Sequence, residues 1–249
     1  MPKFIPYWPS LGQFPGGRKS AMGDFESLMS FLFKVPKNTR LFMSAAVGCC
    51  LFLSLMCGVL AAQVQSTASN ALIEKLRKGG YNLYIRHAAT DWSQSDKIRQ
   101  YGDWESCDPA KVRQLSQQGR HDARELGIAF RSLRIRLGRV FASPYCRTMD
   151  TARLISERDP IPTTDLMNLR AQEFVGGRDV IVARARRRLS QSPMPGVNDL
   201  FVAHGNLGRA AVGVSLGEGQ VAVVAPRGDG RFDVLGTLDA ATLSNMLHR

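Results

Sequence analysis

The stretch YNLYIRHAATDW, residues 81–92, decides the fold class, because a strand pattern runs directly into a polar cluster. Residues 81–86 are rich in aromatic and β-branched side chains, which predicts a strand. They follow the pair Gly79-Gly80, which is expected to end a helix over 71–78. Arg86 and His87 therefore stand where this strand ends.

Helix and strand patterns alternate through the rest of the chain. Helices are expected over 116–134, 145–156 and 178–190 and from Leu207, and strands over 140–143, 200–203, 220–225 and 232–236, the last two as a hairpin. Such alternation predicts an α/β domain with a largely parallel sheet and helices on both faces. Ligands of these folds bind beyond the carboxyl ends of the strands.

Polar residues follow three of the predicted strands, in the segments Arg86-His87, Ser143–Arg147 and His204-Gly205-Asn206. If these strands are parallel neighbours, two histidines and two arginines converge at one edge of the sheet. One imidazole can then attack a phosphorus atom while the other and the guanidiniums hold the phosphate oxygens. Arginine suits this task because its planar fork binds oxygens in pairs. The sequence therefore indicates phosphoryl transfer.

Four segments resemble the motifs of one family, the histidine phosphatase superfamily, which includes the phosphoglycerate mutases. Its Arg-His-Gly signature is similar to residues 84–92 (YIRHAATDW), and the helix that follows it resembles residues 115–127. Its Ser-x-x-x-Arg-x-x-x-Thr-Ala stretch is similar to residues 143–152, and its second histidine motif to residues 202–205. The resemblance spans roughly residues 80–210 in the family's order and implies a phosphoglycerate mutase-like fold.

The resemblance also implies roles for single residues. His87 becomes phosphohistidine, and Arg86, Arg147 and His204 bind the phosphoryl group. A carboxylic acid protonates the leaving oxygen and then activates water. The implied activity is phosphomonoester hydrolysis that needs neither a metal ion nor another cofactor.

The identity of the acid separates two branches of the family. In one branch an Asp directly follows the second histidine, but this chain has Gly205 there. The chain therefore resembles branch 1, which takes a Glu from the segment before the last strand. Glu173 is the candidate on that ground, and Asp91 and Asp103 are reserves.

Two departures from the family pattern point away from a standard mutase. Ala88 replaces the signature glycine, and its methyl group fits only if the backbone φ is not positive. Ser93 stands where many mutases have Asn. Two alternatives therefore stay open, a non-catalytic phosphate-binding module of the same fold and a phosphomutase. The substrate-contact candidates are Thr90, Asp91, Ser93, Trp104 and Asn206, and Trp104 is the one expected to stack on a sugar or base.

The net charge and the cysteines limit which partners, metal sites and compartments are compatible with the sequence. The net charge of +12 favours anionic partners, but no aromatic residues interleave the basic ones as nucleic-acid binding requires. The basic run over 184–188 is read as a solvated helix face, or as a contact to acidic membrane or to a large anionic substrate. The five cysteines and four histidines show no zinc-ligand spacing. Cys107 and Cys146 can form a disulfide if the domain is exported, but the sequence does not supply their separation.

An apolar run over 41–61, LFMSAAVGCCLFLSLMCGVLA, contains no charged residue. A helix of that length spans roughly 30 Å, the thickness of a bilayer core. Basic residues over 34–40 precede it, which predicts that the N-terminus stays in the cytoplasm. Two readings stay open: an uncleaved anchor, or a signal peptide cleaved after Val59-Leu60-Ala61.

Both readings place the C-terminal domain outside the cytoplasm, anchored in the inner membrane with its catalytic domain on the periplasmic side or released into the periplasm. The expected organisation is a disordered basic tail over 1–40, the membrane or signal segment over 41–62, a linker over 63–70 and a histidine phosphatase domain over 71–249. An exported location suggests a small envelope sugar phosphate as the substrate, such as a lipopolysaccharide core heptose phosphate.

Overall fold

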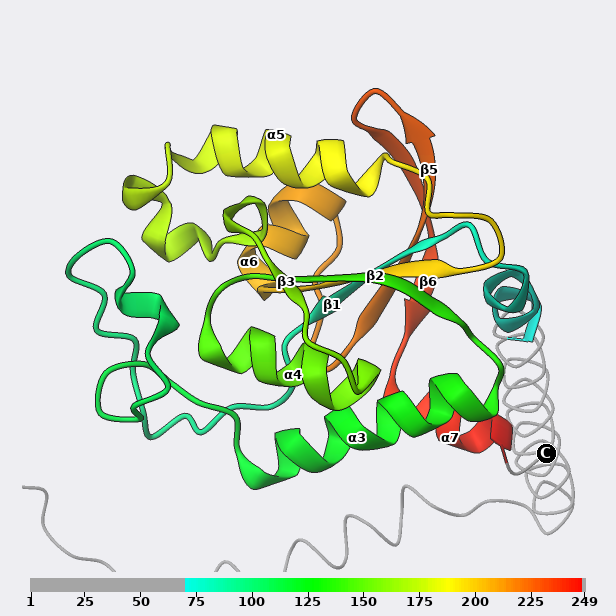
Figure 1. Ribbon diagram of the computed structural model, residues 1–249, viewed down its shortest axis with the longest axis horizontal. Helices are drawn as coiled ribbons and strands as arrows, with labels where there is room; N and C mark the ends of the chain where they lie inside the picture. The colour runs from blue at the N-terminus through cyan, green and yellow to red at the C-terminus, as the bar shows by residue number, and fades with distance from the viewer. Residues whose placement is uncertain (1–69, 248–249) are drawn as a thin grey trace, which may run out of the picture. The chain divides into compact units, whose positions relative to one another are not determined.

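The computed structural model describes residues 70–247 of the chain (Figure 1). The expectations for the tail over 1–40, the apolar segment over 41–62 and nearly all of the linker lie outside these residues. Within residues 70–247, no helix is both long enough and apolar enough to cross a membrane.

One six-stranded sheet in the order β3-β2-β4-β1-β5-β6 forms the centre of the domain. Its bounds are β1 Asn82–Arg86, β2 Leu137–Ala142, β3 Ile161–Pro162, β4 Asn198–Ala203, β5 Val221–Gly228 and β6 Arg231–Leu238. Strands β1 to β4 run parallel, whereas β5 pairs antiparallel with both β1 and β6. The sheet is therefore mixed: the expected parallel sheet is confirmed for four strands, and the expected hairpin supplies the two antiparallel ones.

Helices cover both faces of the sheet (Figure 1). On one face lie a helix over 70–78, α3 (Gln117–Ser132), α4 (Cys146–Ser156) and α7 (Ala240–Leu247). On the other lie α5 (Arg178–Leu189), α6 (Gly205–Leu207), the π-helical turn η4 (Gly208–Val212) and the short helices η2 (Thr164–Leu166) and η3 (Leu169–Phe174). Leu83 and Ile85 pack on the first face and Tyr84 on the second, because side chains alternate along a strand.

The register of three parallel strands brings their polar ends together. Arg86 at the end of β1 lies opposite Ala203 of β4, and Ala142 of β2 lies opposite Val202. The ladder continues beyond the strands: the His87 N–H donates to the Ala203 carbonyl at 2.9 Å, and the Ser143 N–H donates to the Val202 carbonyl at 3.0 Å. Residues 87, 143 and 204 therefore meet at one edge of the sheet.

The predicted elements match the observed ones within a few residues, and the differences have local causes. The helix expected from Leu207 begins at Gly205 and passes into a π-helical turn. Helix α7 and the short helices η1 (Asp103–Glu105), η2 and η3 were not expected, since segments this short carry too few turns to show a period.

Helices α3 and α4 pack closely because α3 carries a glycine at their contact. A Cβ atom added at Gly127 would lie 2.4 Å from the carbonyl oxygen of Ile155, which is backbone and cannot turn aside. Gly119, in the first turn of α3, approaches the Ala89 carbonyl in the same way, at 2.0 Å. The first contact sets the distance between α3 and α4, and the second holds α3 against the loop that leaves β1.

Substitution of Gly127 by Ala should therefore destabilise the domain although alanine favours helix. We expect a loss of about 1–3 kcal/mol in the free energy of unfolding, because the added methyl group forces α3 away from α4. Urea unfolding followed by circular dichroism measures it. Glu125→Ala, at an exposed position of the same helix, is the control and should stay within about 0.5 kcal/mol of wild type. Equal unfolding midpoints for the two variants would contradict the close packing.

Candidate active site

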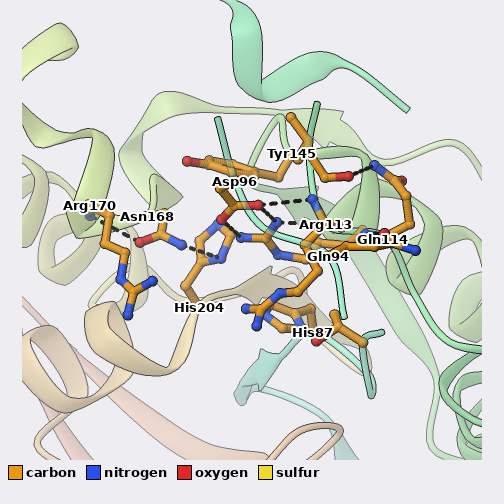
Figure 2. Close-up of polar contacts among 12 residues, drawn as sticks. His87, Gln94, Asp96, Arg113, Gln114, Tyr145, Asn168, Arg170 and His204 are labelled. Carbon is orange, nitrogen blue, oxygen red and sulfur yellow. Dashed lines mark hydrogen bonds and ion pairs between the residues drawn. The ribbon is translucent and has the colours of Figure 1, made fainter. Parts of the chain in front are cut away.

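A cavity of about 490 Å³ opens at the edge of the sheet where β1 and β4 end. His87, His204 and Arg113 line it (Figure 2), and Arg86 also lies in its wall. Its further wall comes from the segment around η3, the start of α5 and residues 205–216. The cavity thus lies at the carboxyl ends of the parallel strands, where ligands of α/β folds bind.

His87 is held so that one ring nitrogen is free to react. Its side chain is buried, and its Nδ1 lies 2.9 Å from the carbonyl oxygen of Ala88. A carbonyl oxygen only accepts, so Nδ1 carries the proton of the neutral ring and Nε2 keeps its lone pair. Burial and, after it, the positive charge of Arg147 lower the pKa of His87 to about 3. A neutral ring with an unprotonated Nε2 is the form a nucleophile needs.

His204 lies beside His87, with 5.6 Å between the ring centroids. Its Nε2 lies 2.9 Å from the Ser143 hydroxyl and its Nδ1 lies 3.3 Å from the amide nitrogen of Asn168. The Asn168 amide is oriented by its oxygen, which accepts from the Arg170 N–H and from the Asn206 side chain. Burial, followed by the charge of Arg147, lowers the pKa of His204 well below its ordinary value. Both imidazoles are therefore neutral before any anion binds.

Arg147 is fully buried at the start of α4, and Asp96 fixes its orientation. The two carboxylate oxygens of Asp96 accept from Nη1 at 2.8 Å and from Nη2 at 3.0 Å. The Arg113 carbonyl accepts the second Nη1 proton at 3.1 Å. The Nε–H of Arg147 is also buried but has no acceptor among the described residues. One edge of this guanidinium is therefore satisfied, and the other is open.

Arg86 and Arg113 also carry a buried Nε–H group without an acceptor among the described residues. The Arg86 Nη groups donate to the Leu216 carbonyl and to Glu218, but its buried Nε–H has no partner in residues 70–247. The Nε–H of Arg113 is likewise buried and unpartnered, while its guanidinium lies 3.8 Å above the centre of the Trp92 ring. Burial and the charge of Arg147 lower the pKa of Arg113. Three buried N–H donors without acceptors, on arginines whose charges act on both imidazoles, are suited to bind an oxyanion.

The carboxylates expected from the sequence do not line this cavity. Glu173 is exposed on η3 and makes no hydrogen bond or ion pair with the described residues. The Asp91 carboxylate accepts from Ser93 and Gln94, and the Ser93 bonds hold its pKa below the ordinary value. Asp103 accepts from the backbone of residues 99 and 100, which lowers its pKa too. Asp96, which the sequence analysis did not single out, is the carboxylate in the wall that the structure describes.

Of the expected substrate-contact residues, only Asn206 lines the cavity. Thr90 is buried and donates to Glu218, and Ser93 donates to Asp91. The choice of Trp104 is wrong: its ring is fully buried and packs against Tyr101 and Phe174. The tryptophan in the cavity wall is Trp92, which is 66% exposed.

Sequence reasoning also missed Asp96 and Arg113. Arg113 stands two residues before the Leu115-Ser116 motif, and nothing in its neighbourhood distinguishes it from the many other arginines of the chain. Asp96 lies 51 residues from Arg147, and a single sequence holds no signal that pairs them. Trp92 could have been found, because it falls inside the motif that carries His87.

A disulfide joins the loop after β1 to the helix that carries Arg147. It links Cys107 to Cys146, whose Cα atoms lie 5.3 Å apart, the pairing that the sequence left open. Since Cys146 directly precedes Arg147, the bond ties the segment that supplies Asp96 and Arg113 to the guanidinium they contact.

The backbone at Ala88, which replaces the glycine of the family signature, has room for a methyl group. Ala88 is not among the residues with positive φ, and its methyl group is buried in the core.

The basic run of α5 is only partly a solvated surface. Arg188 forms an ion pair with Asp165, and Arg186 donates to the Ala211 carbonyl and lies over the ring of Phe232. Arg184 and Arg187 are exposed.

Residues 83–190 match the family described as the histidine phosphatase superfamily (branch 1). This range contains three of the four quoted motifs, and the His204 motif follows it. No curated protein sequence matches the chain.

Several solved structures are similar to the chain. The protein histidine phosphatase SixA, complexed with tungstate, is 16% identical with a TM-score of 0.47, over 66% of this chain and 99% of its own. A phosphoserine phosphatase mutant from Entamoeba histolytica is 13% identical with a TM-score of 0.45, over 66% and 98%. A mycobacterial glucosyl-3-phosphoglycerate phosphatase is 16% identical with a TM-score of 0.43, over 63% and 97%. Similarities this distant do not bear on the substrate of this chain.

The buried neutral histidines should make the stability of the domain depend on pH. The pKa of His87 is about 3 in the folded state, whereas an unfolded histidine titrates near 6.5. The unfolded state therefore binds the extra proton below about pH 6.5, and the free energy of unfolding falls as the pH drops toward 3. Between about pH 6.5 and 5, His87 should contribute a loss on the order of 2 kcal/mol.

Urea unfolding of wild type and of His87→Asn at about pH 7, 6 and 5 measures this effect. The variant should lose less stability on acidification, by roughly one proton in the slope. His121→Asn, at an exposed position of α3, is the control and should follow wild type. An unchanged slope for His87→Asn would mean that the folded protein protonates this ring.

Proposed function

This chain belongs, through residues 83–190, to the histidine phosphatase superfamily (branch 1), and we propose that it hydrolyses phosphomonoesters through a phosphohistidine on His87. One observation carries the proposal. The buried Nε–H groups of Arg86, Arg113 and Arg147 lack acceptors among the described residues, and the charges of all three arginines act on the buried, neutral imidazole of His87. Buried donors are seldom left unsatisfied, and a tetrahedral phosphoryl group offers them three oxygens.

The reaction follows from these positions. The Nε2 lone pair of His87 attacks phosphorus, and the bond from phosphorus to the ester oxygen breaks. The arginine N–H groups and His204 hold the three other oxygens, where charge develops. Water then attacks the phosphorus of the phosphohistidine, returns one proton to the group that protonated the leaving oxygen, and the phosphorus–nitrogen bond breaks, which releases orthophosphate and restores the neutral ring. The Nδ1–H bond from His87 to the Ala88 carbonyl holds the ring orientation throughout.

Protonation of the leaving oxygen needs an acid, and we propose Asp96 for this step. It lines the cavity, whereas Glu173, the candidate from the family resemblance, is exposed outside it. Asp96 would then act both as donor to the ester oxygen and as the group that orients Arg147.

We also propose that the domain works outside the cytoplasm on a small envelope phosphate ester. The apolar run over 41–61 supports export but lies outside the described residues. The Cys107–Cys146 bond supports it too, because disulfides persist in oxidising compartments. Access to an envelope substrate would follow from either an anchor or a cleaved signal peptide.

Replacement of His87 by Ala should abolish hydrolysis, because no other described side chain places a free imidazole nitrogen among the three arginines. We expect kcat/KM for p-nitrophenyl phosphate to fall by at least about a thousandfold. Phosphohistidine is hydrolysed in acid. The covalent intermediate is therefore trapped from a labelled substrate and analysed under alkaline conditions.

His121→Ala is the matched control and should retain both the rate and the label. A wild-type protein that binds phosphate but neither hydrolyses the ester nor takes up label would instead be a binding module. Transfer of phosphate to an acceptor without release of orthophosphate would identify a mutase.

Substrates with different leaving groups test whether Asp96 is the general acid. Asp96→Asn should lower kcat/KM for an alkyl phosphate by about 10²–10⁴-fold, because an alkoxide is a poor leaving group without a proton. The loss should be much smaller for p-nitrophenyl phosphate, whose leaving group is stable as an anion. Glu173→Gln should change neither rate. Equal losses with both esters would assign Asp96 only the orientation of Arg147, and a selective loss in Glu173→Gln would return the acid role to that residue.

A further inference from the structure

We propose that the cavity holds a second oxyanion subsite, made by Arg170, Arg178 and Arg209. The inference rests on the proposed function and narrows its substrate class. The substrate would be a phosphomonoester whose other end carries a second anionic group.

The three arginines come from elements that contact one another. Arg170 lies on η3, Arg178 is the first residue of α5, and Arg209 lies on η4. Helix α5 packs against both η3 and η4, and all three side chains line the cavity that contains His87. They form the wall made by the helices on one face of the sheet, whereas Arg86 comes from the end of β1, Arg113 from the loop after β1, and Arg147 from the first turn of α4.

A chain of polar contacts connects this wall to the reacting histidines. The Arg170 N–H donates to the oxygen of Asn168, and the amide nitrogen of Asn168 faces the Nδ1 of His204. Figure 2 shows Arg170 and His204 on opposite sides of Asn168. The second subsite is thus adjacent to the phosphoryl site and separate from it.

Most arginines in the cavity wall have no carboxylate partner. Arg86 is paired with Glu218, and Arg147 with Asp96. Five arginines line the cavity, and Arg147 is not among them. The four other than Arg86, at positions 113, 170, 178 and 209, have no carboxylate within 4.0 Å among the described residues. A phosphoryl group brings a charge of about −1.5 to −2. One such group therefore leaves roughly two positive charges without a counter-charge, and a second oxyanion supplies it.

The size and lining of the cavity fit such a ligand. Its volume of about 490 Å³ lies within the usual range for small-molecule sites, roughly 300–1,000 Å³, and exceeds the need of a single phosphoryl group. The buried side-chain oxygen of Asn206 accepts no hydrogen bond from the described residues. A hydroxyl group on the carbon skeleton between the two anions would donate to it.

Binding of phosphonates tests the subsite without relying on catalysis, because a phosphonate is not hydrolysed. Isothermal titration calorimetry of the full chain in detergent would compare propylphosphonate with propane-1,3-diphosphonate. We expect the diphosphonate to bind at least about tenfold more tightly at low salt, and the advantage to shrink as salt is raised. A third probe, 4-phosphonobutyrate, tells whether the second group is read as a phosphate or as any oxyanion.

Two variants of α5 with the same change in net charge locate the effect. Arg178→Gln should remove most of the advantage of the diphosphonate over propylphosphonate. Arg184→Gln, at an exposed position of the same helix outside the cavity wall, should keep it. Arg170→Gln and Arg209→Gln should act like Arg178→Gln, each in part.

Equal affinities for the two phosphonates in wild type would overturn the proposal, as would an equal loss in Arg178→Gln and Arg184→Gln, since the effect would then be one of overall charge. Failure of the hydrolase proposal looks different. In that case p-nitrophenyl phosphate would not be hydrolysed, while the preference for the diphosphonate and its loss in Arg178→Gln would remain.

Discussion

The parallel pairing of β1 with β4 is the constraint on which the site depends. It sets Arg86 opposite Ala203, so that the residues just beyond, His87 and His204, leave the sheet side by side. Pairing of β4 with β2 adds Ser143, whose hydroxyl bonds His204. A shift of one residue in either register would turn every side chain to the opposite face and separate the two imidazoles. The core residues on both faces of these strands make that shift costly.

The burial of several positive charges is the second feature on which the site depends. It destabilises the free protein, and it favours the binding of an anionic ligand. Arg147 is fully buried and needs Asp96 as a counter-charge, since an unpaired buried cation strongly destabilises a fold. The carboxylate occupies one edge of the guanidinium and leaves Nε–H for a ligand. Burial, and after it the charge of Arg147, lowers the pKa of both histidines, so that the free site is cationic through its arginines and neutral at its nucleophile. The disulfide holds the loop that makes this arrangement.

Much of the fold was predictable because each main element is long enough to show its period and ends at a polar or glycine residue. The helices α3, α4 and α5 and the strands β1, β2 and β4 fall where the patterns predict them. The residues 86, 87, 147 and 204 were predictable as a group because they follow strands and match family motifs. The short helices, the antiparallel pairing of the hairpin strand β5 with β1, and α7 depend on packing rather than on local pattern.

The sequence alone determined the four motif residues and the α/β class, because periodicity and motif spacing are local properties of a chain. Only the tertiary structure decided which other side chains share their cavity. Asp96 and Arg113 meet Arg147 through contacts between segments far apart in sequence, and the cavity arginines of η3, α5 and η4 gather because those elements pack on one face of the sheet. It also placed Trp104 in the core and Trp92 in the cavity wall, since burial depends on what packs against a side chain and not on its neighbours in the sequence.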